Sequence, residues 1–245
     1  MNRQTKQKLR DALIFLTYYS GWPALRVWFY HWRKVPLLRV IAFHEIKDSE
    51  IENFQKCLVF LKNNFNVISP NDFLAGKFSK IKANALITFD DAFESWLKNV
   101  LPALKKENLS AIFFTDNRGL ALIPALRQAG QTIGGHTVNH SRLTKITRDE
   151  LAFEIAENKK QLESATGQKI VFFAYPFGDK QSFNQTVINE VKKAGYQYGF
   201  TILPGFNKSK TNHYLWHRDS VDLNWSENFL RTWLAGAYDG WKKLL

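Results

Sequence analysis

Apolar and polar positions follow two alternating patterns along the chain from residue 37 onward. Short runs rich in β-branched and aromatic residues predict strands, and the stretches between them have apolar residues three and four positions apart, which predicts amphipathic helices. The predicted strands lie at 38–43, 66–69, 85–89, 111–115, 131–135, 170–175 and 198–203. Strands that alternate with helices form parallel sheets with right-handed crossovers. For a chain of 245 residues, this predicts an α/β fold, a distorted (β/α) barrel of about seven parallel strands.

Three helical stretches carry further signals. Segment 93–104 has one apolar face, which suits packing on a sheet. Thr147 and Glu150 form a capping box, and Gly167 fits the end of the same helix. A docked final helix is predicted behind Ser226, with an apolar stripe formed by Leu230, Trp233, Leu234, Ala237, Trp241 and Leu244.

Residues 1–36 form a separate N-terminal segment, ahead of a barrel predicted at 37–245. The segment combines seven basic side chains and many aromatic rings with one acid, Asp11. Interfacial membrane segments have this composition, so we expect peripheral attachment to the inner membrane of a bacterial cell. An outer helix packed on the barrel is the alternative. The uncharged run 12–25 is too short to cross a bilayer, and no cleavable signal peptide is evident.

The charge balance narrows the class of partner. Lys and Arg number 34 against 22 Asp and Glu, a net charge of +12 spread over the whole length. A positive field concentrates anionic lipids, acidic glycans and nucleic acids alike. No nucleic-acid module or local basic run accompanies the charge, so nucleic acid is the least favoured partner. The single cysteine, Cys57, excludes an internal disulfide.

Reactive side chains follow four of the predicted strands. His44 follows the first, Asp90 and Asp91 follow the third, His136 follows the fifth, and Pro176 begins a turn after the sixth. In β/α barrels the chemistry lies where strands end and loops begin. We therefore expect these side chains to meet at one rim of the barrel.

Asp90 and Asp91 are adjacent carboxylates at the end of a strand. Adjacent side chains leaving a strand diverge, so one can bind a metal while the other accepts a proton from water. Alternatively, Asp91 only caps the next helix, with Glu94 three residues on.

His136 and His140 are four residues apart and follow two glycines. On a helical turn, this spacing places both imidazoles on one face, where they can hold one cation. A histidine pair at this spacing can also be incidental. With Asp91 as a third ligand, coordination positions remain for water and substrate.

A buried strand at 170–175 runs into a turn that contains Pro176 and Gly178. The turn either shapes a loop or aims a backbone N–H into the site. Tyr175 and Phe177 would then supply an aromatic wall for the face of a sugar.

These motifs resemble those of the polysaccharide deacetylase family, also called the NodB-homology domain or carbohydrate esterase family four. The resemblance covers roughly residues 37–225 and rests on three motifs, at 88–91, 136–140 and 175–178. It implies a barrel of the NodB-homology type.

The resemblance also implies roles for individual residues. Asp90 is the expected base. Asp91, His136 and His140 are the expected ligands of a divalent metal, zinc in the first place, with cobalt, nickel or manganese as alternatives. The N–H of Phe177, in the turn with Tyr175 and Pro176, is expected to help hold the oxyanion.

The chain departs from the family pattern in two places. Many members have an arginine that orients the base two residues before the motif-three proline, where this chain has Ala174. Arg218, at the start of a late strand, is the expected substitute, and an ordinary surface arginine is the alternative. The late histidine motif that supplies the general acid is missing around 201–205. His44 is the expected replacement because its setting resembles the Tyr-His of members that cleave partly acetylated surface glucosamine polymers.

Two other histidines, His213 and His217, are fallback candidates for the general acid, and each can also be a solvated loop histidine. The function implied is metal-dependent removal of an N-acetyl group from an amino sugar. The substrate would be a cell-surface glycan, such as lipopolysaccharide or exopolysaccharide, or its lipid-linked precursor. The alternatives are a non-catalytic glycan-binding or assembly protein, and hydrolysis of a phosphoester or a non-sugar amide.

Overall fold

The computed structural model describes the backbone of residues 3–239 and the side chains of residues 10–239. Seven strands form a parallel sheet in the order β7-β6-β5-β4-β3-β1-β8, and β2 pairs with the start of β3. The strands are β1 (Leu38–Phe43), β2 (Asn66–Val67), β3 (Asn84–Asp90), β4 (Ile112–Thr115), β5 (Thr132–Gly135), β6 (Phe172–Ala174), β7 (Tyr198–Phe200) and β8 (Asp219–Ser220). The seven predicted strands correspond to β1 to β7.

An irregular segment closes the sheet between β7 and β1. Phe200 in β7 bridges Trp216, and Asp219 in β8 lies opposite Ile41 in β1. Between them, the N–H of Arg218 donates to the carbonyl of Leu203 at 3.1 Å. The predicted distorted barrel is therefore confirmed, and its seam is the least regular part.

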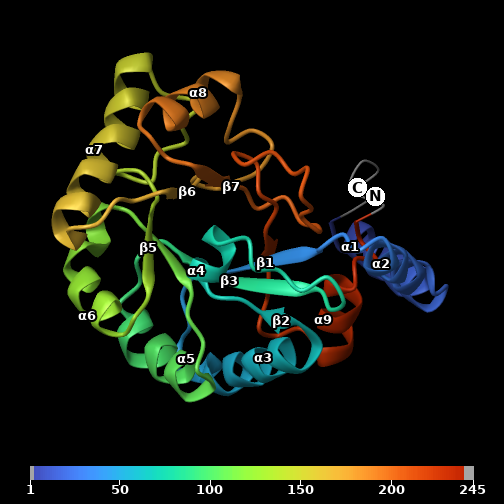
Figure 1. Ribbon diagram of the computed structural model, residues 1–245. Coiled ribbons are helices and arrows are strands. Elements are labelled where there is room, and N and C mark those ends of the chain that lie inside the picture. Colours follow the sequence, from blue (N-terminus) through green and yellow to red (C-terminus); the bar gives the residue numbers. More distant parts are fainter. Residues whose placement is uncertain (1–2, 240–245) are drawn as a thin grey trace.

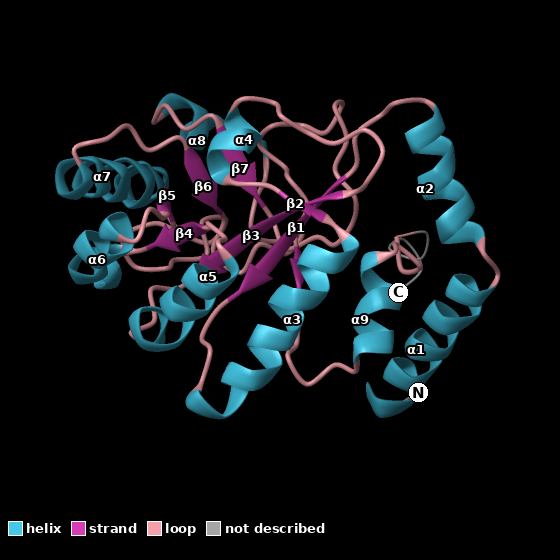
Figure 2. Ribbon diagram, turned by 60° about the horizontal axis from the view of Figure 1, so that its bottom comes forward, coloured by secondary structure: helices cyan, strands magenta, loops and turns pink. Residues whose placement is uncertain are grey.

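Helices surround the strands, as Figures 1 and 2 show. Around the barrel lie α3 (Ile51–Asn64), α5 (Leu101–Glu107), α6 (Ile123–Gln128), α7 (Arg148–Thr166), α8 (Gln185–Lys193) and α9 (Glu227–Leu234). The short helix α4 (Pro70–Leu74) lies inside this ring in Figure 1, and its Phe73 packs in the apolar cluster of the barrel interior. Short turns of 3-10 or π helix occur at Asp48–Glu50, Trp96–Val100 and Asn117–Leu122. In α7 the Thr147 hydroxyl accepts from the Glu150 N–H, and Gly167 ends the helix at φ 64°, so both predicted end signals are confirmed.

The final helix is shorter than its apolar stripe predicted. Ser226 caps α9 as expected, but the helix ends at Leu234 and Gly236 follows with a φ of 91°. A positive φ breaks a right-handed helix, and glycine reaches it without strain. Trp241 and Leu244, which were predicted to extend the stripe, lie outside the described residues.

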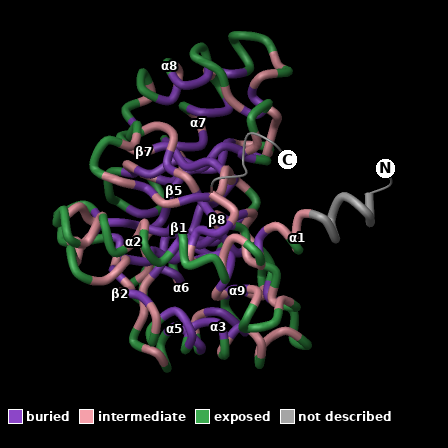
Figure 3. Tube along the Cα trace, turned by 90° about the vertical axis from the view of Figure 1, so that its right-hand side faces the viewer, coloured by how far each residue is buried: buried purple, intermediate pink, exposed green. Residues whose placement is uncertain are grey.

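Alternation along β3 decides which side chains enter the barrel. Leu86 contributes to the interior apolar cluster, whereas Ile87 and Phe89 pack outward beneath the helices. Side chains of a strand point to opposite faces in turn, so Asp90 has the same phase as Leu86 and faces the interior. Buried segments concentrate on the strands in Figure 3. The strand period therefore carries a carboxylate to the inner rim.

The N-terminal segment forms two helices, α1 (Arg3–Tyr19) and α2 (Trp22–Trp32). Ile14 is fully buried, and Phe15 packs edge-on against Phe229 of α9 with ring centroids 5.8 Å apart. The segment therefore packs on the outside of the barrel, and this packing is compatible with membrane attachment because Trp22, Trp28 and Trp32 stay exposed. Within residues 3–239, no helix combines the length and the apolar character needed to cross a bilayer.

Candidate active site

Asp90 and Arg218 form a buried ion pair at the carboxyl end of β3. The Arg218 guanidinium donates to both carboxylate oxygens of Asp90 at 2.7 Å and to the Thr201 carbonyl at 2.9 Å. Arg218 has no exposed surface and Asp90 is 2% exposed. Two parallel N–H···O bonds fix the carboxylate in one orientation. Arg218 is thus the partner that the sequence analysis expected for Asp90. It belongs to the irregular segment that joins β7 to β1.

The surroundings of Asp90 keep its carboxyl group ionised. Burial raises the pKa of Asp90, but the Arg218 guanidinium lowers it by more through its charge and its hydrogen bonds, with further lowering from the neighbouring His136 and His44. The net pKa is below the ordinary value for aspartate. Asp90 is therefore a carboxylate at neutral pH and is able to accept a proton.

Asp91, His136 and His140 converge beside this ion pair. The Nε2 atoms of His136 and His140 lie 3.2 Å and 3.1 Å from the same Asp91 Oδ1. One potential ligand atom from each residue lies within 4.8 Å of the others. The structure therefore brings together the three ligands that the motifs predicted.

The donor atoms of this cluster fit a divalent cation. His136 Nδ1 lies 2.8 Å from the Ala174 carbonyl, an acceptor, so Nδ1 carries the proton and Nε2 offers a lone pair toward Asp91. The buried Oδ1 of Asp91 has no hydrogen-bond donor among the described residues. A buried acceptor facing two imidazole nitrogens is costly without a cation. Two histidines and one carboxylate are donors that suit zinc and similar metals.

The helical turn expected for His136 and His140 is absent; both lie in the loop after β5. Thr137 has a φ of 69° and His140 a φ of 56°, which rules out a regular helix there. Asp91 and Phe177, with φ of 80° and 62°, have left-handed backbones as well. Strained backbone of this kind gathers at functional sites because the surroundings hold it in place. A strained loop, and not a helical turn, therefore brings His136 and His140 together.

Two polar residues of α7, which the sequence analysis did not single out, hold this loop. Glu154 accepts from the Asn139 N–H at 2.9 Å and from the Asn139 side chain at 2.7 Å. Asn158 accepts from the His136 N–H at 3.1 Å. Both residues are buried and lie one turn apart on the inner face of α7. In the sequence, Glu154 and Asn158 interrupt the apolar face of α7, and these two polar residues among apolar ones could have indicated a buried role.

The two glycines before His136 are required by packing. A Cβ on Gly134 would lie 2.5 Å from the Phe114 ring, and a Cβ on Gly135 would lie 2.1 Å from the Tyr196 hydroxyl. Neither distance is compatible with a side chain. Strand β5 can therefore approach its neighbours closely enough to deliver His136 to the cluster.

The turn after β6 places Phe177 at the site but not Tyr175. Phe177 is 45% exposed, and the centroid of its ring lies 4.8 Å from that of the His140 ring. The Arg142 guanidinium lies over the same ring, 4.4 Å from its centroid. Tyr175 is only 1% exposed, and its hydroxyl donates to the Tyr214 carbonyl at 2.9 Å. The prediction that Tyr175 forms an aromatic wall for substrate is therefore wrong. Its side chain points out of the barrel, like that of Phe173 two residues earlier, and is buried in the core beneath the helices. Pro176 is buried beside it.

His44 lies next to Asp90 across the sheet. Phe43 in β1 is paired with Phe89 in β3, so the residues that follow them, His44 and Asp90, are neighbours. His44 is exposed, and its carbonyl accepts from the Trp96 indole N–H at 3.0 Å, which anchors its backbone. An exposed imidazole beside the carboxylate is suitably placed for proton transfer.

The other two histidines considered for the acid lie elsewhere. The His213 ring packs on Tyr198, the first residue of β7, with centroids 5.4 Å apart. The His217 N–H donates at 2.8 Å to Asn207, which bridges Leu38 at the start of β1. His213 therefore lies at the amino end of β7 and His217 near the amino end of β1, whereas Asp90 lies at the carboxyl end of β3.

Comparison with known proteins agrees with this geometry. Residues 79–199, which include the Asp90–Asp91 pair, both histidines of the cluster and the turn at Phe177, match the family model for polysaccharide deacetylase. This part of the chain belongs to the polysaccharide deacetylase family. The Bacillus subtilis protein YxkH, provisionally named a polysaccharide deacetylase, is 28% identical over 201 residues, 75% of this chain and 71% of YxkH. The peptidoglycan-N-acetylmuramic acid deacetylase PdaA of Bacillus subtilis is 29% identical over 119 residues, 46% of this chain and 44% of PdaA.

Solved structures share the fold of this chain. The Streptococcus pyogenes deacetylase PplD, solved in complex with acetate, superposes with a TM-score of 0.70 at 22% identity, over 81% of this chain and 99% of PplD. IcaB from Ammonifex degensii gives a TM-score of 0.65 at 22% identity, over 84% of this chain and 97% of IcaB. At these identities the likeness establishes the fold, a NodB-type half-barrel of parallel strands.

Removing one ligand of the cluster should weaken cation binding. We expect His136→Ala to lower the affinity for Zn²⁺ on the order of 100-fold, because one of three protein ligands is lost. Calorimetric titration of the purified protein with Zn²⁺ measures this directly. His213→Ala is the matched control and should bind Zn²⁺ as the unsubstituted protein does. Equal affinities for both variants would contradict the assignment of His136 as a ligand.

Proposed function

We propose that this deacetylase-family hydrolase uses a divalent metal, zinc in the first place, to remove the N-acetyl group from an amino sugar in a cell-surface glycan or its lipid-linked precursor. One observation carries the proposal: a carboxylate fixed by a buried arginine, Asp90 with Arg218, lies beside a cluster of one aspartate and two histidines. A base next to a metal cluster is the arrangement that amide hydrolysis by water requires.

Each residue of the site has a separate role in the proposed reaction. A cation held by Asp91, His136 and His140 would supply Lewis acidity toward water and the acetyl carbonyl. Asp90 accepts the proton of the attacking water, and Arg218 keeps the carboxylate charged and oriented. The Phe177 N–H, in its left-handed turn, is our candidate donor to the carbonyl oxygen as negative charge develops there.

We assign the proton transfer to the leaving amine to His44. It is exposed at the rim next to Asp90, and neither His213 nor His217 shares that position. A protonated imidazole gives its proton to the amine nitrogen as the C–N bond breaks, so acetate and a free amino sugar result. The exposed ring of Phe177 can pack on the apolar face of the sugar.

The charge of the chain bears on the choice of glycan. The net charge of +12 favours a substrate that carries phosphate or carboxylate groups over a neutral polymer. Both a lipopolysaccharide precursor and a lipid-linked amino sugar have such groups. PdaA is named for an N-acetylated amino sugar of a surface glycan, N-acetylmuramic acid in peptidoglycan.

Acetate release tests the proposal. Zn²⁺-loaded protein is incubated with a panel of N-acetylated oligosaccharides and lipid-linked N-acetyl sugars, and acetate is quantified enzymatically. We expect metal-dependent release from at least one acidic substrate, and His44→Ala should lower kcat by about 10²- to 10³-fold. His217→Ala serves as the matched histidine control and should retain activity.

The outcomes separate the proposed function from its alternatives. Binding of a glycan without acetate release, by protein that holds Zn²⁺, would favour a glycan-binding or assembly role. Release of phosphate in place of acetate would favour a phosphoesterase. Full activity of His44→Ala would leave deacetylation intact and exclude His44 as the acid.

A further inference from the structure

Most of the large apolar side chains of α2 are exposed, although Pro23 is buried against the protein. Exposed positions include Trp22 at 60%, Trp28 at 60% and Trp32 at 65%. The side that faces the protein holds Arg26, which donates to Asp239 at 2.8 Å, and Tyr30, whose hydroxyl pairs with Lys208. A surface helix of a water-soluble domain has the reverse arrangement, polar outside and apolar inside.

The apolar surface extends over both N-terminal helices. Of the 13 large hydrophobic residues exposed in the described part of the chain, seven lie within residues 16–32. Leu16 and Tyr19 lie three residues apart in α1, and the exposed residues of α2 recur every three or four positions, so each helix has one exposed apolar face. The seven residues are Leu16, Tyr19, Trp22, Leu25, Trp28, Phe29 and Trp32. We call these seven residues the hairpin stripe. A concentrated exposed patch of this kind marks an interaction surface.

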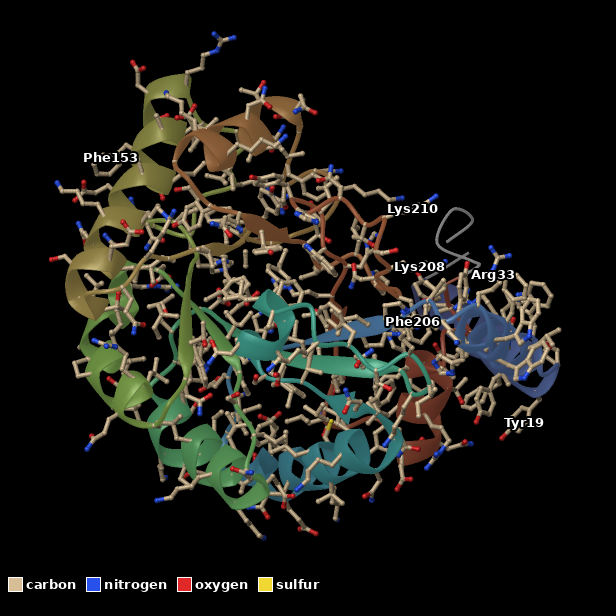
Figure 4. The ribbon with its side chains drawn as sticks, viewed as in Figure 1. Tyr19, Arg33, Phe153, Phe206, Lys208 and Lys210 are labelled. Atoms are coloured by element: carbon tan, nitrogen blue, oxygen red, sulfur yellow. The ribbon has the colours of Figure 1, made fainter. Side chains whose placement is uncertain are left out.

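Every charged side chain of residues 12–44 is basic, so the segment that carries the hairpin stripe contributes cations only. Arg33 and Lys34 are exposed at its end, and the sequence contains no acidic residue between Asp11 and Glu45. Figure 4 shows Tyr19 and Arg33 at the outer side of the hairpin, with Lys208 and Lys210 on the neighbouring loop. Aromatic rings rimmed by cations, with no acid between, are complementary to a surface of anionic headgroups over an apolar layer.

We propose that the hairpin stripe is a membrane-interface surface, which places its Trp and Tyr rings at headgroup depth in a bilayer that contains anionic phospholipid. Indole and phenol rings prefer this depth because one part is apolar and another forms hydrogen bonds. The helices lie on the bilayer and do not cross it, in keeping with their length and polarity. Lipid binding uses no residue of the metal cluster, so this inference goes beyond the proposed function and does not depend on it.

A second copy of the chain is a poorer occupant of the same surface. In a two-fold dimer through the stripe, Arg33 and Lys34 of both copies would approach the same patch. No acidic residue of segment 12–44 is available there to pair with them. Like charges without partners oppose association. Anionic lipid, in contrast, pairs with every one of these cations.

Vesicle flotation of the full chain tests the proposal. The protein is mixed with vesicles of phosphatidylcholine alone, or of phosphatidylcholine and phosphatidylglycerol, and the floated fraction is quantified. We expect binding to the mixed vesicles that weakens as salt is raised, because exposed charges are screened. Trp22→Ser/Trp28→Ser/Trp32→Ser should lower the partition coefficient by roughly 100-fold, since three exposed rings lose their contact with lipid.

Two further variants sharpen the result. Phe153→Ser is the matched control: Phe153 is 55% exposed on α7, away from the hairpin in Figure 4, and its loss should leave flotation unchanged. Arg33→Ala/Lys34→Ala should lower binding to the mixed vesicles by roughly 20-fold and hardly affect binding to phosphatidylcholine. Circular dichroism and thermal unfolding verify that each variant is folded.

Three outcomes would overturn the proposal. They are no flotation of the wild-type protein with mixed vesicles, equal flotation of the triple tryptophan variant when folded, and a lipid-free dimer that the triple variant dissociates. The last would show that a second copy covers the hairpin stripe. Failure of deacetylation in the acetate assay would not affect these measurements.

Discussion

Replacing Asp90 with Asn is expected to lower kcat for acetate release by about 10²- to 10⁴-fold, the usual contribution of a general base. The amide keeps the shape of the carboxylate but cannot accept a proton from water. KM should change little, because Asp90 is 2% exposed and offers a bound sugar almost no contact surface. The measurement is steady-state acetate release with Zn²⁺ content verified in each preparation.

Asp219→Asn is the matched control for this substitution. Asp219 is also fully buried and accepts from an arginine, Arg39, at 3.0 Å and 3.2 Å, but it faces outward toward Trp233 of α9. Both variants lose a buried carboxylate charge beside a guanidinium, so both should be less stable. Only Asp90→Asn should lose catalysis. Comparable activity in the two variants would exclude Asp90 as the base.

Replacing Arg218 with Met is expected to destabilise the fold by about 3–5 kcal/mol, the cost of leaving one partner of a buried ion pair uncompensated. Burial raises the pKa of Asp90, and the guanidinium is the largest influence that opposes it. Its removal therefore also favours the protonated, inactive form of the base. Chemical denaturation measures the first effect and kcat at neutral pH measures the second.

A double-mutant cycle separates the pair from its surroundings. Asp90→Asn/Arg218→Met removes both charges, so its loss of stability should be smaller than the sum of the two single losses. Arg218→Lys keeps the charge but not the two parallel N–H groups, and we expect it to recover stability better than activity. Additive single effects would show that the contact between Arg218 and Asp90 contributes little to stability.

The local features of the fold could be predicted from the chain alone. The seven strands, the capping box of α7 and the convergence of reactive side chains at strand ends depend on side-chain period and on short-range hydrogen bonds. The same period directs Asp90 into the barrel, since Leu86 and Asp90 are four residues apart on one strand. Three sequence motifs were enough to propose the ligands Asp91, His136 and His140, because family members share both residue type and order.

Contacts between distant segments could not be predicted with the same certainty. Arg218 reaches Asp90 across 128 residues of sequence, through a seam that has almost no regular strand. The histidine loop is held by Glu154 and Asn158, which look like ordinary polar residues of a helix until α7 docks. Tyr175 was misjudged because its direction depends on which face of β6 is turned toward the helices.

The sequence by itself determined which side chains exist near each strand end and with what periodicity, because those properties depend on neighbours a few residues apart. The tertiary structure decided that Arg218 is buried on Asp90 and is not an ordinary surface arginine, which aromatic ring reaches the site and which face of α2 is exposed. These depend on how the barrel closes and how helices dock on it. Burial, dielectric environment and ion pairing arise only from that packing, and they set the chemistry of Asp90.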